Sequence, residues 1–336
     1  FNDGRLKVLT EKDKEKIILM NNRMASAALR VLALAYSKDE KEENLIFLGL
    51  TGMMDPARAE AKTAIKVCKK AGIRVIMITG DNAITAQAIA KELNLRDKVL
   101  TGEQLEKLNK NDLKHAVRKV DIYARVNPEH KVKILEALQE NGEIVAMTGD
   151  GINDAPALKA ANVGIAMGIT GTDVSKESSD MILLDDNFNS IVHAVKHGRR
   201  IFDNIKKFVK LLLSANFGEI GIIFVSLIAG LPLPLLPLQI LWINLITDGL
   251  PAIALGVDPA EKDVMKRKPR NPKQGILHNN LTFLILSGII LTVIGLSLFI
   301  PNLENIEKAR TMAVMGLIVF ELFLVFVCGS RTETIF

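Results

Sequence analysis

The sequence has 336 residues, with 43 Lys and Arg against 38 Asp and Glu and a formal net charge of +5. In residues 1–207 the basic residues are interleaved with acidic ones, as on a solvated surface, so the excess does not indicate a nucleic-acid partner. Its two cysteines, Cys68 and Cys328, stand far apart, which indicates neither a disulfide framework nor a zinc cluster.

Charge is distributed unevenly along the chain. Residues 1–207 hold most of the charged side chains, whereas 208–329 consist of long apolar runs. This contrast predicts two unlike regions that meet near Phe208. The sequence opens at Phe1 without an initiating Met or a signal segment, so we expect it to begin within a longer protein.

Between residues 45 and 200, short β-rich apolar runs alternate with helical segments. The runs are 74–79, 143–148, 163–167 and 181–184. This rhythm predicts an α/β fold with a doubly wound parallel sheet. Asp55 and Pro56 predict the start of a helix that Gly72 ends. Ligands of such sheets bind at the carboxyl ends of strands, so we expect the site in the loops that follow two of these runs.

The first of these loops has the sequence Thr-Gly-Asp-Gly-Ile-Asn-Asp over 148–154. Its two carboxylates and one carboxamide suit Mg²⁺, and glycine on both sides of Asp150 lets backbone N–H groups approach a phosphate. Gly-Asp-Gly alone also occurs in ordinary strand-to-helix turns. A second Thr-Gly-Asp at 79–81, and Lys131 at the start of a helix, favour a phosphoryl-transfer site.

Four apolar segments are long enough to cross a bilayer: about 208–229, 236–256, 281–300 and 310–328. Buried helices of a soluble protein are the alternative, but 281–300 is uncharged throughout, which disfavours it. The connector 257–280 is basic at 266–270, whereas 301–307 is mildly acidic. The positive-inside rule therefore predicts a cytoplasmic soluble region.

Polar residues inside these segments predict an ion site, because they are costly in a bilayer. Helical spacing places Asn216 with Glu219 on one face, and Asn244, Thr247 and Asp248 together on another. Glu321 lies roughly 15 Å from Thr311 at 1.5 Å per residue, near mid-bilayer. We expect Gly249 and Pro251 to unwind the helix after Asp248 and free backbone carbonyls. Such hard oxygen ligands suit Ca²⁺, and Mn²⁺ is an alternative.

Four stretches carry a family resemblance. Residues 148–154, continued by Ala-Pro-Ala-Leu-Lys, resemble the hinge signature of P-type ATPases, whose phosphorylation domain is haloacid-dehalogenase-like. Residues 53–58 are similar to the family's Asp-Pro-Pro-Arg hinge, with Ala57 in place of the second proline. Residues 29–35 resemble the end of its nucleotide-binding domain, and 241–252 resemble the calcium-pump branch, including sarco/endoplasmic-reticulum types.

The resemblance implies three domains: the end of a nucleotide-binding domain (1–44), a haloacid-dehalogenase-like phosphorylation domain (45–207) and a transmembrane helical bundle (208–336). It implies that ATP or its phosphate contacts Arg30, Thr79, Gly80, Asp81, Arg125, Lys131 and Asn153. The catalytic residues would be Lys131, Asp150, Asn153 and Asp154, with Mg²⁺ at Asp150 and Asp154. Transported Ca²⁺ would bind Asn216, Glu219, Asn244, Thr247, Asp248 and Glu321.

The implied function is ATP-driven export of Ca²⁺ from the cytoplasm through an aspartyl-phosphate cycle. The family's nucleophilic Asp lies in Asp-Lys-Thr-Gly-Thr, which does not occur in this sequence, so we expect the chain to be inactive alone. The alternatives are a truncated ion-binding or regulatory subunit and a membrane-anchored phosphatase. The membrane would be the cell membrane of a bacterium or an internal membrane.

Overall fold

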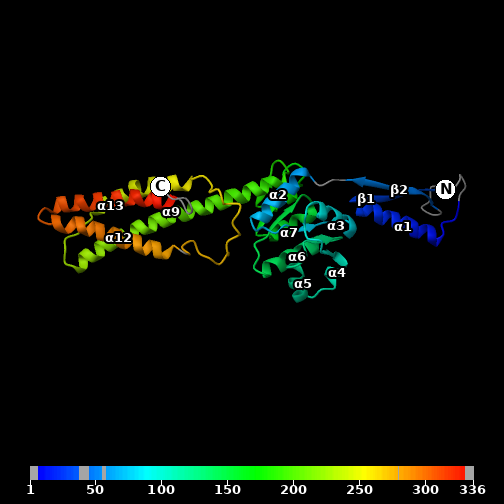
Figure 1. Ribbon diagram of the computed structural model, residues 1–336, viewed down its shortest axis with the longest axis horizontal. Helices are drawn as coiled ribbons and strands as arrows, with labels where there is room; N and C mark the ends of the chain where they lie inside the picture. Colours follow the sequence, from blue (N-terminus) through cyan, green and yellow to red (C-terminus); the bar gives the residue numbers. More distant parts are fainter. Residues whose placement is uncertain (1–6, 38–44, 55–57, 279, 330–336) are drawn as a thin grey trace. The chain divides into compact units, whose positions relative to one another are not determined.

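The computed structural model describes residues 7–37, 45–54, 58–278 and 280–329 (Figure 1). The chain divides into two compact units. The first comprises 1–193 with 265–269, and the second comprises 194–264 with 270–336. Phe1 and the expected helix start at Asp55 and Pro56 lie outside the described residues.

The first unit begins with a helix and an antiparallel hairpin. Helix α1 (Glu11–Ser26) starts at Thr10, whose side chain and that of Asp13 cap each other's backbone N–H groups. Strands β1 (Leu29–Tyr36) and β2 (Ile46–Met54) pair with a bulge between Leu34 and Ala35, and α1 packs against β1. The stretch resembling the end of a nucleotide-binding domain is thus a strand of this hairpin.

The predicted parallel α/β fold is confirmed, and its strands form two three-stranded parallel sheets. Their orders are β3-β5-β4 and β6-β7-β8. The strands are β3 (Met77–Ile78), β4 (Val99–Thr101), β5 (Ile122–Ala124), β6 (Ala146–Gly149), β7 (Val163–Met167) and β8 (Met181–Leu183). In the described part of the chain, β3 pairs only with β5 and β6 only with β7, so each has one unpaired edge.

Short helices connect these strands. They are α2 (Ala59–Lys70), α3 (Ala83–Glu92), α4 (Gly102–Glu106), α5 (Lys110–Val117), α6 (Pro128–Glu140), the 3₁₀ turn η1 (Ile152–Asp154), α7 (Ala155–Ala160) and α8 (Asp173–Glu177). Because side chains alternate along a strand, Tyr123 of β5 packs in one core cluster with Ile134, while the neighbouring Ile122 packs in another with Ile65. Strand β5 is therefore buried on both faces, as a central parallel strand should be.

Within the described residues, four helical stretches are long and apolar enough to cross a membrane: 188–228, 237–256, 281–302 and 306–329. The elements are α9 (Phe188–Ile228), α10 (Pro237–Trp242), the π-helical turn η2 (Ile243–Asp248), α11 (Gly249–Gly256), α12 (Leu281–Phe299), the 3₁₀ turn η3 (Ile300–Asn302) and α13 (Ile306–Gly329). Helices α12 and α13 pack side by side (Figure 1). The predicted segments therefore correspond to four helical stretches of the structure.

Two features of the membrane helices differ from expectation: where the first helix begins, and whether the second helix unwinds. The first span is not a separate helix from 208, because α9 begins at Phe188, and its first turns bury Ile191 and Val192 in the first unit. The second helix does not unwind at Gly249 and Pro251. The helix continues through Pro251, and the wide π-helical turn η2 directly precedes α11, in which Pro251 lies.

Helix α9 also caps the C-terminal end of α11. Arg200 and Asn204 donate hydrogen bonds to carbonyls of 256–258, and the buried Lys207 Nζ lies 2.9 Å from Asp258 Oδ2. Cations at a helix C-terminus compensate its unpaired carbonyls and its dipole. These contacts fix the end of the helix that starts beside Asp248.

Gly72 gives a test of the packing of 265–269 in the first unit. It ends α2 with φ +74°, and a Cβ there would lie 2.7 Å from Pro269 Cδ, whereas Gly142 after α6 has φ +83° and open space. Gly142→Ala should cost about 1–2 kcal/mol of unfolding free energy from the left-handed backbone alone. Gly72→Ala should cost more, as measured by pulse proteolysis in urea. Equal losses would contradict the Pro269 contact.

Candidate functional site

Asp154 organises the loop that follows β6. Its Oδ2 accepts the backbone N–H groups of Asp150, at 3.3 Å, and Gly151, at 3.2 Å, while its Oδ1 accepts the ammonium of Lys131. The Asp154 side chain is buried. A charged pair with additional hydrogen bonds is the form in which a buried carboxylate is tolerated. Both oxygens of Asp154 are therefore engaged by the protein.

Asp150 and Asn153 lie on the same loop but are exposed. Among the described residues, the Asp150 carboxylate accepts no hydrogen bond. The Asp150 carbonyl, in contrast, accepts the Thr172 N–H at 2.9 Å and the Ser175 hydroxyl at 3.2 Å. The loop thus has a fixed backbone and a free carboxylate. Of the two aspartates, Asp150 fits a direct Mg²⁺ ligand, whereas Asp154 fits a residue that holds the loop.

The loop after β3 forms a second cluster. Thr79 Oγ1 donates to Asp81 Oδ2 at 2.9 Å, and the Asp81 carbonyl accepts the Arg125 N–H at 3.0 Å. Arg125 follows β5 with φ +50°, and the exposed Gly80 has open space around it. Four of the residues predicted to contact ATP are therefore brought together at the carboxyl ends of two paired strands.

The segment 125–131 contacts both loops. Its first residue bonds to Asp81 and its last residue, Lys131, bonds to Asp154. Between them, Asn127 and His130 form a reciprocal cap at the start of α6, which fixes where Lys131 leaves the helix. This short segment joins the strand ends of the two three-stranded sheets into one region.

Arg30 is placed elsewhere. It is exposed on β1 opposite Met53, and in the part of the chain that the structure describes no hydrogen bond or ion pair joins it to the two loops. Its predicted contact with ATP stays a prediction.

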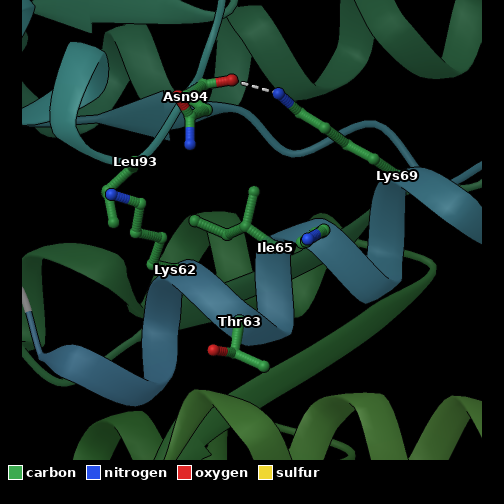
Figure 2. A pocket seen from close by; sticks show the side chains of 7 residues that line it. Lys62, Thr63, Ile65, Lys69, Leu93 and Asn94 are labelled. Atoms are coloured by element: carbon green, nitrogen blue, oxygen red, sulfur yellow. Dashed lines mark hydrogen bonds between the residues drawn. The ribbon is translucent and has the colours of Figure 1, made fainter.

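A surface hollow between α2 and the end of α3 lies apart from these residues (Figure 2). Lysines 62, 66 and 69 line it together with Leu93 and Asn94, and Lys69 donates a hydrogen bond to the Asn94 carbonyl. None of the residues predicted for phosphoryl transfer lines it. The hollow does not belong to the candidate site.

In the membrane region, three buried carboxyl groups come from three helical segments: Glu219 of α9, Asp248 of η2 and Glu321 of α13. Asn244 Nδ2 donates to Glu219 Oε2 at 3.2 Å, and η2 packs against α13. The other five oxygens of these three carboxyl groups are buried without a hydrogen-bond partner among the described residues.

Five unpartnered carboxyl oxygens are costly unless a proton or a cation compensates them. Within the described ranges, however, no three Asp, Glu, His or Cys side chains are grouped closely enough to hold a metal ion by themselves. A cation bound beside these carboxyl groups would need further oxygen ligands. Asn216 uses its amide N–H on the Leu212 carbonyl, which leaves its Oδ1 as an acceptor, and Thr247 is nearly buried beside Asp248.

Two family models match the chain. Residues 15–162 match haloacid dehalogenase-like hydrolases, and residues 232–336 match the C-terminus of cation transporting ATPases. The first match contains both the Thr79–Asp81 and the Asp150–Asp154 loops, and the second contains Asn244, Asp248 and Glu321.

Curated relatives align along nearly the whole chain. It is 47% identical to a calcium-transporting ATPase of Bacillus subtilis (strain 168), over 99% of this chain and 39% of the relative. Calcium-transporting ATPase 1 of Bacillus cereus (strain ATCC 10987 / NRS 248) is 47% identical over 100% of this chain and 41% of its own length. Calcium-transporting ATPase type 2C member 1 of Homo sapiens is 43% identical over 99% and 37%. The chain thus spans about two fifths of these relatives.

Gly149 tests the arrangement of the Asp154 loop. An added Cβ at Gly149 would lie 2.4 Å from Asp154 Cβ, whereas one at Gly151 would meet nothing closer than 3.6 Å. Gly149→Ala should therefore cost about 1–3 kcal/mol of unfolding free energy by displacing Asp154. Gly151→Ala should stay within about 0.5 kcal/mol. Urea unfolding of the two variants measures this, and similar losses would contradict the close packing.

Proposed function

We propose that this chain, which belongs to the calcium-transporting branch of the P-type ATPases, forms the phosphoryl-transfer and ion-binding part of an ATP-driven pump that exports Ca²⁺ from the cytoplasm. The observation that carries the proposal is the segment 125–131, which joins the Thr79–Asp81 loop to the Asp150–Asp154 loop. Two strand-end loops joined in this way form a site for a transferring phosphoryl group.

The roles of the soluble residues follow from their partners. Lys131, held by Asp154, would meet a phosphoryl oxygen, and Asp150 would bind Mg²⁺, which supplies charge neutralisation when it is bound. Asn153 is exposed on the same loop and would contact the phosphate. Thr79, Gly80, Asp81 and Arg125 would contact ATP or its phosphate from the neighbouring strand ends, and Arg30 would do so from the hairpin.

The nucleophile requires a further segment of the complete pump. We infer that an additional parallel strand lies between the unpaired edges of β3 and β6 and ends in the nucleophilic Asp. Two observations support this inference. Neither edge has a backbone partner among the described residues, and Ala146 of β6 is exposed although parallel strands are normally covered. A strand there would end between the two loops.

The ion site would use Asn216, Glu219, Asn244, Thr247, Asp248 and Glu321, completed by oxygens from other segments of the pump. The five unpartnered carboxyl oxygens support a hard cation. Mn²⁺ also accepts such ligands, but the relatives are named as calcium-transporting ATPases, which favours Ca²⁺. The chain is an integral membrane protein, and its basic connector at 266–270 supports a cytoplasmic soluble region.

The two alternatives receive no support. Calcium-transporting ATPases align over the whole chain, through the soluble and the membrane regions alike. A membrane-anchored phosphatase or a separate regulatory subunit would not account for this continuous likeness.

In the complete pump, Asp150→Asn should abolish Mg²⁺-dependent phosphorylation from labelled ATP. Because the carboxylate is exposed, the unfolding free energy should change by less than about 0.5 kcal/mol. Asp97→Asn, at another exposed aspartate, is the control and should phosphorylate normally. Normal turnover by the Asp150 variant would refute the assignment of this loop.

In the same pump, Glu219→Gln or Glu321→Gln should weaken one site and halve the bound Ca²⁺ if two ions bind, since each change removes one charged ligand while keeping volume. Asp248→Asn should eliminate both ions, because its two oxygens are both unpartnered and buried. Equilibrium ⁴⁵Ca binding in detergent measures the stoichiometry. Glu307→Gln, at the exposed start of α13, is the control. Full binding by the Asp248 variant would contradict the proposal.

A further inference from the structure

Asp186, which follows β8, is buried and has φ +49°. Its Oδ1 accepts the N–H groups of Gly168 at 2.6 Å and Ile169 at 2.9 Å, and its Oδ2 accepts both the N–H and the hydroxyl of Thr170 at 2.8 Å. Burial raises the pKa of Asp186, but these hydrogen bonds outweigh it and lower the pKa to about 2. The carboxylate is therefore ionised at neutral pH and fully used by one loop.

That loop, residues 168–172, leads directly to the backbone of Asp150. Thr172 donates its N–H to the Asp150 carbonyl. Ser175, fully buried in the helix that Thr172 caps, shares its hydroxyl proton between the Thr172 carbonyl at 2.7 Å and the Asp150 carbonyl at 3.2 Å. Asp186 thus acts on the Asp150 loop through the intervening backbone. Among the described residues, Asp186 makes no hydrogen bond with the Asp150 carboxylate itself.

The backbone carbonyl of Asp186 contacts Arg58, the residue that precedes α2. Arg58 donates a hydrogen bond to the Asp186 carbonyl. Asp186 has a left-handed backbone conformation, and its side chain holds the 168–172 loop. Arg58 follows directly after 53–57, the rest of the stretch that resembles the family's hinge. Asp186 therefore connects Arg58 to the loop that supports Asp150.

We propose that Asp186 is a positioning residue for phosphoryl transfer, which fixes the 168–172 loop and through it the direction in which Asp150 presents its carboxylate. The inference rests on the proposed role of Asp150 as the Mg²⁺ ligand. Groups that hold a ligand's backbone limit the orientations of its side chain, and they change metal affinity when they are lost.

The test uses Asp186→Asn in the complete pump. Asparagine keeps the volume, but its NH₂ group would face N–H and O–H donors, from which it cannot accept a hydrogen bond. The half-saturating Mg²⁺ concentration for phosphoenzyme formation should rise about 10-fold. Without Mg²⁺ or ATP, hydrogen exchange of the 149–151 amides should also become faster. Asp185→Asn is the matched control, because Asp185 is exposed and, within the described ranges, its carboxylate accepts hydrogen bonds from Asn187 and Ser190 and none from the 168–172 loop.

Two further variants separate positioning from general stability. Ser175→Ala removes one of the two hydrogen bonds to the Asp150 carbonyl and leaves the one from the Thr172 N–H. It should raise the Mg²⁺ requirement in the same direction, and its effect in the double variant with Asp186→Asn should be less than additive. Thr170→Ala removes one of the four hydrogen bonds to the Asp186 carboxylate. If Asp186→Asn does not fold, the Mg²⁺ requirement and the amide exchange of Thr170→Ala are measured in its place.

An unchanged Mg²⁺ requirement with less phosphoenzyme at every Mg²⁺ concentration would overturn the proposal, as would unchanged exchange at 149–151. If Asp150→Asn phosphorylates normally, the proposed function fails. The exchange comparison then still decides whether Asp186 orders the loop.

Discussion

The carboxylate of Asp154 receives the Lys131 ammonium and two backbone amides in a buried position, and much of the soluble site depends on it. Because both of its oxygens are engaged, the exposed Asp150 is left as the residue with free oxygens. Because Asp154 packs directly over residue 149, that position must be glycine. Because Lys131 lies in the first turn of α6, the pair also ties the helix after β5 to the loop after β6. One buried ion pair thus sets the division of labour between two aspartates of the same loop.

The two regions treat carboxylates in opposite ways. In the soluble unit, Asp154 and Asp186 are buried with every oxygen satisfied by donors of the protein, so they organise backbone. In the membrane unit, Glu219, Asp248 and Glu321 are buried with five oxygens unsatisfied. The first arrangement stabilises one loop conformation. The second is costly as it stands and becomes favourable only when a cation or a proton arrives, which suits groups that bind and release a cargo.

Strand periodicity was sufficient to predict the α/β fold and the two strand-end loops, since apolar runs and turn residues are local signals. Periodicity could not distinguish Asp150 from Asp154, because the difference between them is that Asp154 is buried and paired with Lys131, 23 residues away in the sequence. The change in composition at Phe208 marks where apolar residues begin and carries no signal for a helix start, so the beginning of α9 at Phe188 was missed. The proposed role of Asp186 has no sequence motif, because three of the four donors to its carboxylate are backbone amides. The ligand assignments at both sites stay predictions.

The π-helical turn at 243–248 has a consequence for how one helix can serve two neighbours. A turn closed by i→i+5 bonds holds an extra residue compared with the α-helical turns around it, so it introduces a dislocation in the helical phase. Side chains before and after the dislocation are out of step with each other. Asn244 bonds to Glu219 on α9, while the same turn packs against α13, which bears Glu321. A single helical turn can thereby present side chains to two neighbouring helices, which a regular helix with one polar face could not do.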